Sequence, residues 1–136
     1  MGTRKFTPTR EWEDARQLRG LAGELEALAW LVSRGWEVEA HRFRMGRHDL
    51  DLVVRRGHMV AFVEVKTRRG AAAGSPSEAV GLRKQGTLAR VAALWSLRYG
   101  RPEDEYRFDV VEVFDEGAGR YRVAHLEDAW RLLGGH

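Results

Sequence analysis

The stretch Val60–Lys66, with the sequence VAFVEVK, constrains the fold of this chain more than any other segment. Its apolar residues are almost continuous, and such runs are typical of strands that are covered on both faces. Strands of this kind lie at the centre of layered α/β folds. We therefore expect Val60–Lys66 to be a central strand. The two charged residues inside it, Glu64 and Lys66, need a partner or a function, because an unpaired buried charge is costly.

Hydrophobic periodicity predicts the elements around this strand. Apolar residues at intervals of three and four predict the first helix, and Gly35 follows it where a helix-terminating glycine is common. Arg56-Gly57 supplies a tight turn between the second and third strands. The predicted helices span 11–34, 76–99 and 126–133, and the predicted strands span 36–43, 49–55, 59–67, 106–114 and 121–124.

The start of the second helix is well marked, because Ser75, Pro76 and Glu78 form a capping box with Ser75 as the N-cap. The resulting order, αβββαββα, predicts an α/β fold: a three-layer sandwich with a mixed central sheet. We assign residues 1–10 to a flexible basic tail and residues 11–136 to a single domain. A chain of 136 residues with 43% hydrophobic content builds one core.

Composition narrows the class of protein. No apolar stretch approaches the length of a membrane span, and the basic N-terminus is not followed by the apolar run of a secretory signal. The chain contains no cysteine, which excludes disulfides, thiolate metal sites and cysteine nucleophiles. We therefore expect a cytoplasmic protein without a membrane partner.

Arginine dominates the positive charge of the chain, with 20 of the 23 basic residues. A surface that binds phosphates would explain this excess, but the absence of asparagine and isoleucine favours a coding bias against adenine and thymine. Against that bias, a retained lysine marks a position that needs a compact ammonium or an amine whose pKa can move. Lys66 and Lys84 are the two lysines that lie inside predicted elements.

Two carboxylates and one ammonium are expected to meet on neighbouring strands. Glu64 and Lys66 are two residues apart, so they point to the same face. In the preceding strand, alternation places Asp49 and Asp51 on one face and Leu50 and Leu52 on the other. Antiparallel pairing brings Asp51 close to Glu64. Two carboxylates suit Mg²⁺, with Mn²⁺ as a substitute. The alternative is that Glu64 and Lys66 pair with each other or line a solvated edge.

Such a metal site predicts phosphodiester hydrolysis. The metal would polarise a phosphodiester oxygen and lower the pKa of a bound water. Lys66 would orient that water or offset the charge that grows on the phosphate.

Other charged residues flank this group. Glu24 lies beside the apolar stripe of the first helix, where it adds a third acid or is an ordinary boundary glutamate. Lys84 falls on the inner stripe of the second helix and needs an acidic partner, a phosphate, or a path to the rim. His48 is the only histidine near the acids and is expected to be a turn residue. Arg107 and Asp109 share a strand face and are expected to pair with each other or with a neighbour.

A set of arginines near the ends of the acidic strands is a candidate for contacts with a nucleic-acid backbone. The alternative is a solvated charged edge that guards against aggregation. The set consists of Arg42, Arg44, Arg47, Arg68 and Arg69.

At these residues the sequence resembles the YraN family, which belongs to the PD-(D/E)XK nuclease superfamily and is similar to archaeal Holliday-junction resolvases. The resemblance covers about Leu18 to the end of the chain. Its motifs are Gly23-Glu24, Asp49-Leu50-Asp51-Leu52, Phe62-Val63-Glu64-Val65-Lys66-Thr67-Arg68, Gly74-Ser75-Pro76, Lys84 and Arg107-Phe108-Asp109-Val110-Val111.

The resemblance implies a restriction-endonuclease-like fold and assigns roles by position. Asp51 and Glu64 would hold the metal, Lys66 would act in catalysis, and Glu24 would be the acid of the first helix. The family usually has Gly-Glu-Ile-Asp at residues 48–51, so Asp49 is one methylene shorter than the usual glutamate.

The leading hypothesis is a Mg²⁺-dependent endonuclease that acts on structured or branched DNA. A homodimer would match the two-fold symmetry of a four-way junction. The alternatives are a non-catalytic nucleic-acid-binding module of the same fold, which would bind without metal, and a scaffold protein in which the acids are structural.

Overall fold

The structure, a computed structural model, describes residues 15–69 and 80–131. The predicted tail at residues 1–10 lies outside this part of the chain. The described elements are α1 (Ala15–Ser33), β1 (Glu37–Met45), β2 (His48–Arg56), β3 (Met59–Arg69), α2 (Leu82–Tyr99), β4 (Glu105–Gly117) and β5 (Arg120–Trp130). None of the helices in the described ranges is long and apolar enough to cross a membrane.

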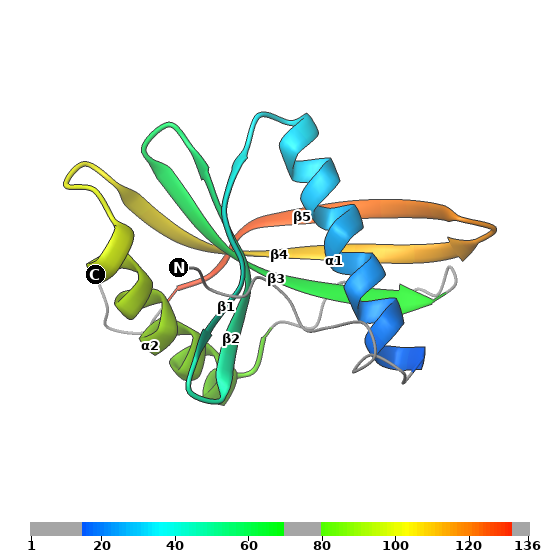
Figure 1. Ribbon diagram of the computed structural model, residues 1–136, viewed down its shortest axis with the longest axis horizontal. Coiled ribbons are helices and arrows are strands. Elements are labelled where there is room, and N and C mark those ends of the chain that lie inside the picture. The colour runs from blue at the N-terminus through cyan, green and yellow to red at the C-terminus, as the bar shows by residue number, and fades with distance from the viewer. Residues whose placement is uncertain (1–14, 70–79, 132–136) are drawn as a thin grey trace, which may run out of the picture.

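The five strands form one mixed sheet in the order β1-β2-β3-β4-β5. Only β3 and β4 run parallel, and α2 is the crossover that joins them; the other neighbours are antiparallel. In Figure 1, α1 crosses the long strands β3, β4 and β5, whereas α2 lies beside the β1–β2 hairpin. The predicted α/β sandwich with a mixed sheet is confirmed, and β3 is its central strand.

Two hydrophobic clusters cover the two faces of β3, as its continuous apolar sequence predicts. The α2 cluster contains Leu50, Val53, Val60, Phe62, Val80, Leu88, Val91, Ala92, Trp95, Val110 and Trp130. The α1 cluster contains Ala27, Leu31, Trp36, Leu52, Val54, Ala61, Val63, Val111 and Val113. Each helix therefore buries its apolar side against one face of the sheet, which gives the three layers.

The predicted helix at 126–133 is wrong over the described residues, because β5 continues to Trp130. Val110 pairs with Leu126 and Phe108 pairs with Trp130, so β5 has two more residues than β4 between these pairs. Asp128, with φ of 53°, bends the strand at this point. The ring of Trp130 then stacks on Phe108 with 4.0 Å between centroids, and this packing holds the segment to the sheet.

The start of the second helix is also corrected. Helix α2 begins at Leu82, and its N-cap Gly81 is extended, with φ of −64° and ψ of 156° and no side-chain cap. Val80 is buried in the α2 cluster, and its carbonyl accepts a hydrogen bond from the Gln85 side chain at 2.7 Å. Burial of Val80 next to the extended Gly81 accounts for the later start. The predicted capping box at residues 75–78 lies outside the described residues.

Helix α1 approaches β3 closely at Gly23. A Cβ atom at this position would overlap the hydroxyl oxygen of Thr67 and lie 3.1 Å from the Thr67 Cβ. Threonine is stiff at χ1 and its Cβ is fixed to the backbone, so side-chain rotation cannot relieve this contact. Only glycine lets α1 come this near, and the next residue along the helix is Glu24.

We expect Gly23→Ala to lower the free energy of unfolding by about 1–3 kcal/mol, because the extra methyl group overpacks the helix–sheet contact. Gly20→Ala is the matched control, since its Cβ would meet no atom within 4 Å. It should raise stability by up to about 1 kcal/mol through helix propensity. Urea unfolding of both variants measures the difference, and equal stabilities would contradict the close contact at Gly23.

Candidate functional site

Strands β2 and β3 separate at Asp51 and Glu64. The last pair between them is Leu52 with Val63, so Asp51 and Glu64 stand opposite each other where the ladder ends. Beyond this pair a side chain replaces the backbone as hydrogen-bond acceptor: Asp51 Oδ2 accepts a hydrogen bond from the Val65 N–H at 2.8 Å. The predicted approach of these two strands is confirmed. We call this point, with Asp51 and Glu64, the strand fork.

The regular alternation of β2 breaks beside the fork. Leu50 packs in the α2 cluster and Leu52 packs in the α1 cluster, although residues two apart in a regular strand share a face. The prediction of one common face for Leu50 and Leu52 was therefore wrong.

The two acids of the fork repel each other. Burial is the main factor that raises the pKa of Asp51 to about 8, and the neighbouring charge of Glu64 adds to it. Glu24 raises the pKa of Asp51 further, whereas the Val65 N–H and the Lys84 charge lower it. Electrostatic coupling to Asp51 thus links Glu24, Glu64 and Lys84, and the fork is a place where an additional cation would be stabilised.

Lys84 contacts an acidic side chain, which is one of the three alternatives predicted for it. Its Nζ lies 2.7 Å from Glu64 Oε2, and the side chains are 55% and 10% exposed respectively. Burial alone would lower the pKa of Lys84, but the hydrogen bond and charge of Glu64 outweigh it, so the pKa is raised. The lysine of α2 and the glutamate of β3 therefore form an ion pair at the rim of the fork.

Glu24 is held by two consecutive residues of β1. The Arg42 guanidinium donates from Nε to Glu24 Oε1 at 2.8 Å and from Nη2 to Oε2 at 3.3 Å, and His41 Nε2 lies 2.9 Å from Oε1. Neighbours in a regular strand point to opposite faces, but Arg42 has φ of 62°, which lets both side chains reach one carboxylate. Burial alone would raise the pKa of Glu24. The hydrogen bonds and charges of His41 and Arg42 outweigh burial, so the net effect is a lowered pKa.

His41 is the site residue that the sequence analysis missed, since it singled out the exposed His48 instead. The available signal was strand register: His41 pairs with Leu52, the neighbour of Asp51. Counting outward from the turn at Gly46-Arg47 gives this pairing.

Lys66 follows Glu64 by two residues on β3 and is half-buried. Within the described ranges its side chain makes no hydrogen bond or ion pair, and its cross-strand neighbour is Glu112 of β4. The alternative of a Glu64–Lys66 ion pair is therefore wrong, because Glu64 pairs with Lys84.

The five candidate arginines occupy different environments. Arg42 holds Glu24, Arg44 pairs with Asp49 at 2.9 Å on the surface, and Arg68 pairs with Glu112 at 3.1 Å. Arg47 and Arg69 are exposed and have no ion pair among the described residues.

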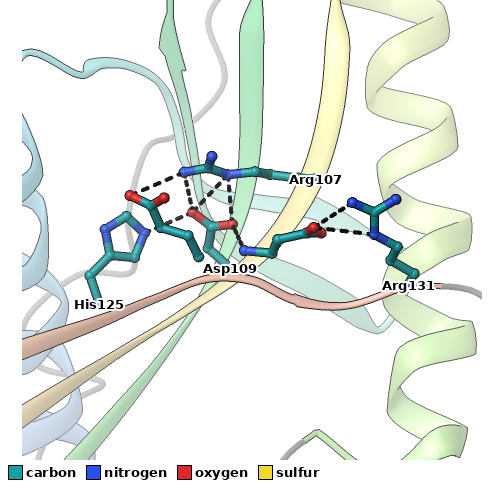
Figure 2. Close-up of polar contacts among 6 residues, drawn as sticks. Arg107, Asp109, His125 and Arg131 are labelled. Carbon is teal, nitrogen blue, oxygen red and sulfur yellow. Dashed lines mark hydrogen bonds and ion pairs between the residues drawn. The ribbon is translucent and has the colours of Figure 1, made fainter.

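A second polar group lies around Asp109, which is 1% exposed. As predicted, Arg107 pairs with it, at 3.0 Å from Nε to Oδ1. His125 Nε2 lies 2.7 Å from Asp109 Oδ2, and the Asp128 N–H donates to Oδ1 at 2.9 Å. Figure 2 shows Arg107 and His125 converging on Asp109. We call these residues the Asp109 network; it fastens β5 to β4.

The fork offers the ligands that Mg²⁺ takes. No group of three or more histidine, cysteine or acidic side chains with metal-binding geometry occurs in residues 15–69 and 80–131. Mg²⁺ does not need such a cage, since it binds one or two carboxylates and completes its shell with water and phosphate. Asp51 and Glu64, two repelling carboxylates at the end of a ladder, fit this requirement.

Comparison with known proteins identifies the family. The model of the uncharacterised protein family UPF0102 matches residues 23–113, which include the fork, Glu24 and Lys84. A UPF0102 protein of Symbiobacterium thermophilum is 41% identical over 111 residues, covering 82% of this chain and 94% of that protein. One from Beutenbergia cavernae is 43% identical over 112 residues, covering 82% and 95%. The chain belongs to the UPF0102 family, which confirms the resemblance to YraN.

Proposed function

We propose that this protein is a Mg²⁺-dependent endonuclease that hydrolyses phosphodiester bonds of structured or branched DNA. The observation that carries the proposal is the convergence at the strand fork: Asp51 and Glu64 stand opposite each other, and Glu24 and Lys84 reach them from two helices. A purely structural role gives little reason to bury two carboxyl groups side by side, because each loses its hydration and their negative charges repel each other.

Asp51 and Glu64 would hold Mg²⁺, with Mn²⁺ as a substitute. A bound Mg²⁺ would supply Lewis acidity toward the phosphodiester and a water of lowered pKa. Lys66, which has no ion pair among the described residues, is available to orient that water or to offset charge on the phosphate. Glu24, kept ionised by Arg42 and His41, adds negative potential that favours a cation.

The exposed Arg47 and Arg69 are available for contacts with backbone phosphates, with Arg44 and Arg68 beside them. Such contacts position a strand without reading its sequence, which suits recognition of DNA shape. A homodimer would present two forks to a symmetric junction.

The test is a cleavage assay on labelled duplex, branched and single-stranded DNA with Mg²⁺ or Mn²⁺. We expect the wild type to cleave branched DNA and Lys66→Ala to cleave about 100-fold more slowly with DNA binding retained. Arg90→Ala, which removes an exposed charge of α2, should cleave like the wild type. DNA binding without metal and without cleavage by any variant would favour the non-catalytic module instead.

A further inference from the structure

We propose that Lys84 is an exchangeable counter-ion of the fork: it gives up Glu64 to a divalent cation and then binds a phosphate of the nucleic-acid strand. This inference rests on the proposed function. It adds that Lys84 changes its partner when the metal binds. In the structure the ammonium of Lys84 and the carboxylate of Glu64 are 2.7 Å apart.

Lys84 and a metal at the fork would compete for Glu64. Its Oε2 already accepts a charge-assisted hydrogen bond from Lys84, and its carboxylate is one of the two that would hold the metal. An ammonium and a divalent cation on the same carboxylate repel each other strongly at this separation. Occupation of the fork by the metal therefore favours departure of Lys84.

The Lys84 side chain can leave Glu64 with little rearrangement. The Lys84 side chain is 55% exposed, so its flexible stem can turn outward without leaving a buried gap. Lys84 also lies in the first turn of α2, where the helix dipole disfavours a cation. Arg42 is held more firmly, because its side chain is only 19% exposed and donates two hydrogen bonds to Glu24. Of Arg42, which pairs with Glu24, and Lys84, which pairs with Glu64, Lys84 is therefore the exchangeable cation.

A destination for the ammonium lies at the start of α2. The same first turn presents backbone N–H groups, and the N-cap Gly81 provides no side-chain cap for them. Helix N-termini favour anions, and a released lysine beside these N–H groups adds a full positive charge. A phosphate of a strand whose scissile group lies at the fork is the anion that this arrangement would bind.

The experiment begins without nucleic acid, by calorimetric titration of Mn²⁺ into the wild type, Lys84→Met and Lys84→Arg. Lys84→Met should bind Mn²⁺ about tenfold more tightly than the wild type, because no cation has to leave Glu64. Lys84→Arg keeps the competing charge and should stay near the wild-type affinity. Arg83→Met is the matched control, since it removes one exposed charge from the same turn of α2. It should change the affinity less than twofold.

The second arm measures binding of branched DNA at several salt concentrations, with EDTA or with Ca²⁺. Adding Ca²⁺ should steepen the salt dependence more in the wild type than in Lys84→Met. The extra slope is about 0.9, the value for one added phosphate contact. Equal changes of slope in both proteins would overturn the second half of the proposal.

Failure of this inference and failure of the proposed function are distinguishable. If the wild type binds Mn²⁺ and cleaves DNA but Lys84→Met binds Mn²⁺ no more tightly, the exchange is wrong and the endonuclease stands. If the wild type binds no divalent cation at all, both the exchange at Lys84 and the proposed Mg²⁺-dependent endonuclease are wrong.

Discussion

Asp51→Asn is expected to make the metal-free protein more stable than the wild type at pH 8.5. Burial and Glu64 raise the pKa of Asp51 to about 8, so the folded protein retains a proton on Asp51 that the unfolded chain loses near pH 4. Stability of the wild type therefore falls as pH rises from about 4 to 8. Asparagine carries no charge and keeps a carbonyl oxygen that can accept the hydrogen bond from Val65 N–H.

The measurement is urea unfolding in EDTA at pH 4.0 and pH 8.5. The stability difference between Asp51→Asn and the wild type should widen by about 2–4 kcal/mol over this range. Asp49→Asn is the control on the same strand, where the carboxylate pairs with Arg44 at the surface, and its difference should stay nearly constant. Parallel stabilities of Asp51→Asn and the wild type would contradict a buried, repelled carboxylate.

Millimolar Mg²⁺ should narrow the stability difference between these two proteins at pH 8.5. The wild type gains stability through binding, by about 2.7 kcal/mol when the metal is at 100 times its Kd. Asp51→Asn loses one of the two carboxylates and should gain little. Melting curves with and without Mg²⁺ measure the gain in stability of each protein. Glu64→Ala should also lose most of the gain that the wild type shows.

Asp109→Ala is expected to lower the free energy of unfolding by about 3–5 kcal/mol, because it leaves buried cationic and polar groups without their acceptor. Asp109 is 1% exposed and is contacted by Arg107, His125 and the Asp128 N–H. A loss of this size is a large fraction of the stability of a single domain.

The control for this prediction is Glu116→Ala on the same strand. Glu116 pairs with Arg122 at the surface, with side chains 39% and 53% exposed, and such pairs contribute about 1 kcal/mol or less. Urea unfolding distinguishes the two variants, and hydrogen exchange should show faster exchange at residues 126–130 in Asp109→Ala. Equal losses in both variants would contradict a structural role for the Asp109 network.

The sequence predicted the parts of the fold and site that follow from local periodicity. The continuous apolar run identified β3 as the central strand, and alternation together with hairpin pairing brought Asp51 to Glu64. Arg107 and Asp109, two residues apart on one strand, were predicted to pair and do so.

The remaining features depend on conformations that periodicity does not encode. No pattern predicts that Arg42, which is not a glycine, adopts φ of 62°, yet this allows Arg42 and His41 to hold Glu24 together. The extension of β5 to Trp130 depends on stacking against Phe108, which is distant in the sequence. The choice among the three alternatives for Lys84, an acidic partner, a phosphate or a path to the rim, required the position of α2 relative to β3.

Because Glu24 comes from α1 on one face of the sheet and Lys84 from α2 on the other, the fork depends on both outer layers at once. Local opening that detaches either helix would separate charges brought together by packing, even while the five strands stay hydrogen-bonded. For the proposed metal site the two separations would act in opposite directions: detaching α1 would remove the negative charge of Glu24, whereas detaching α2 would remove the competing ammonium of Lys84 and leave Asp51 and Glu64 on their strands.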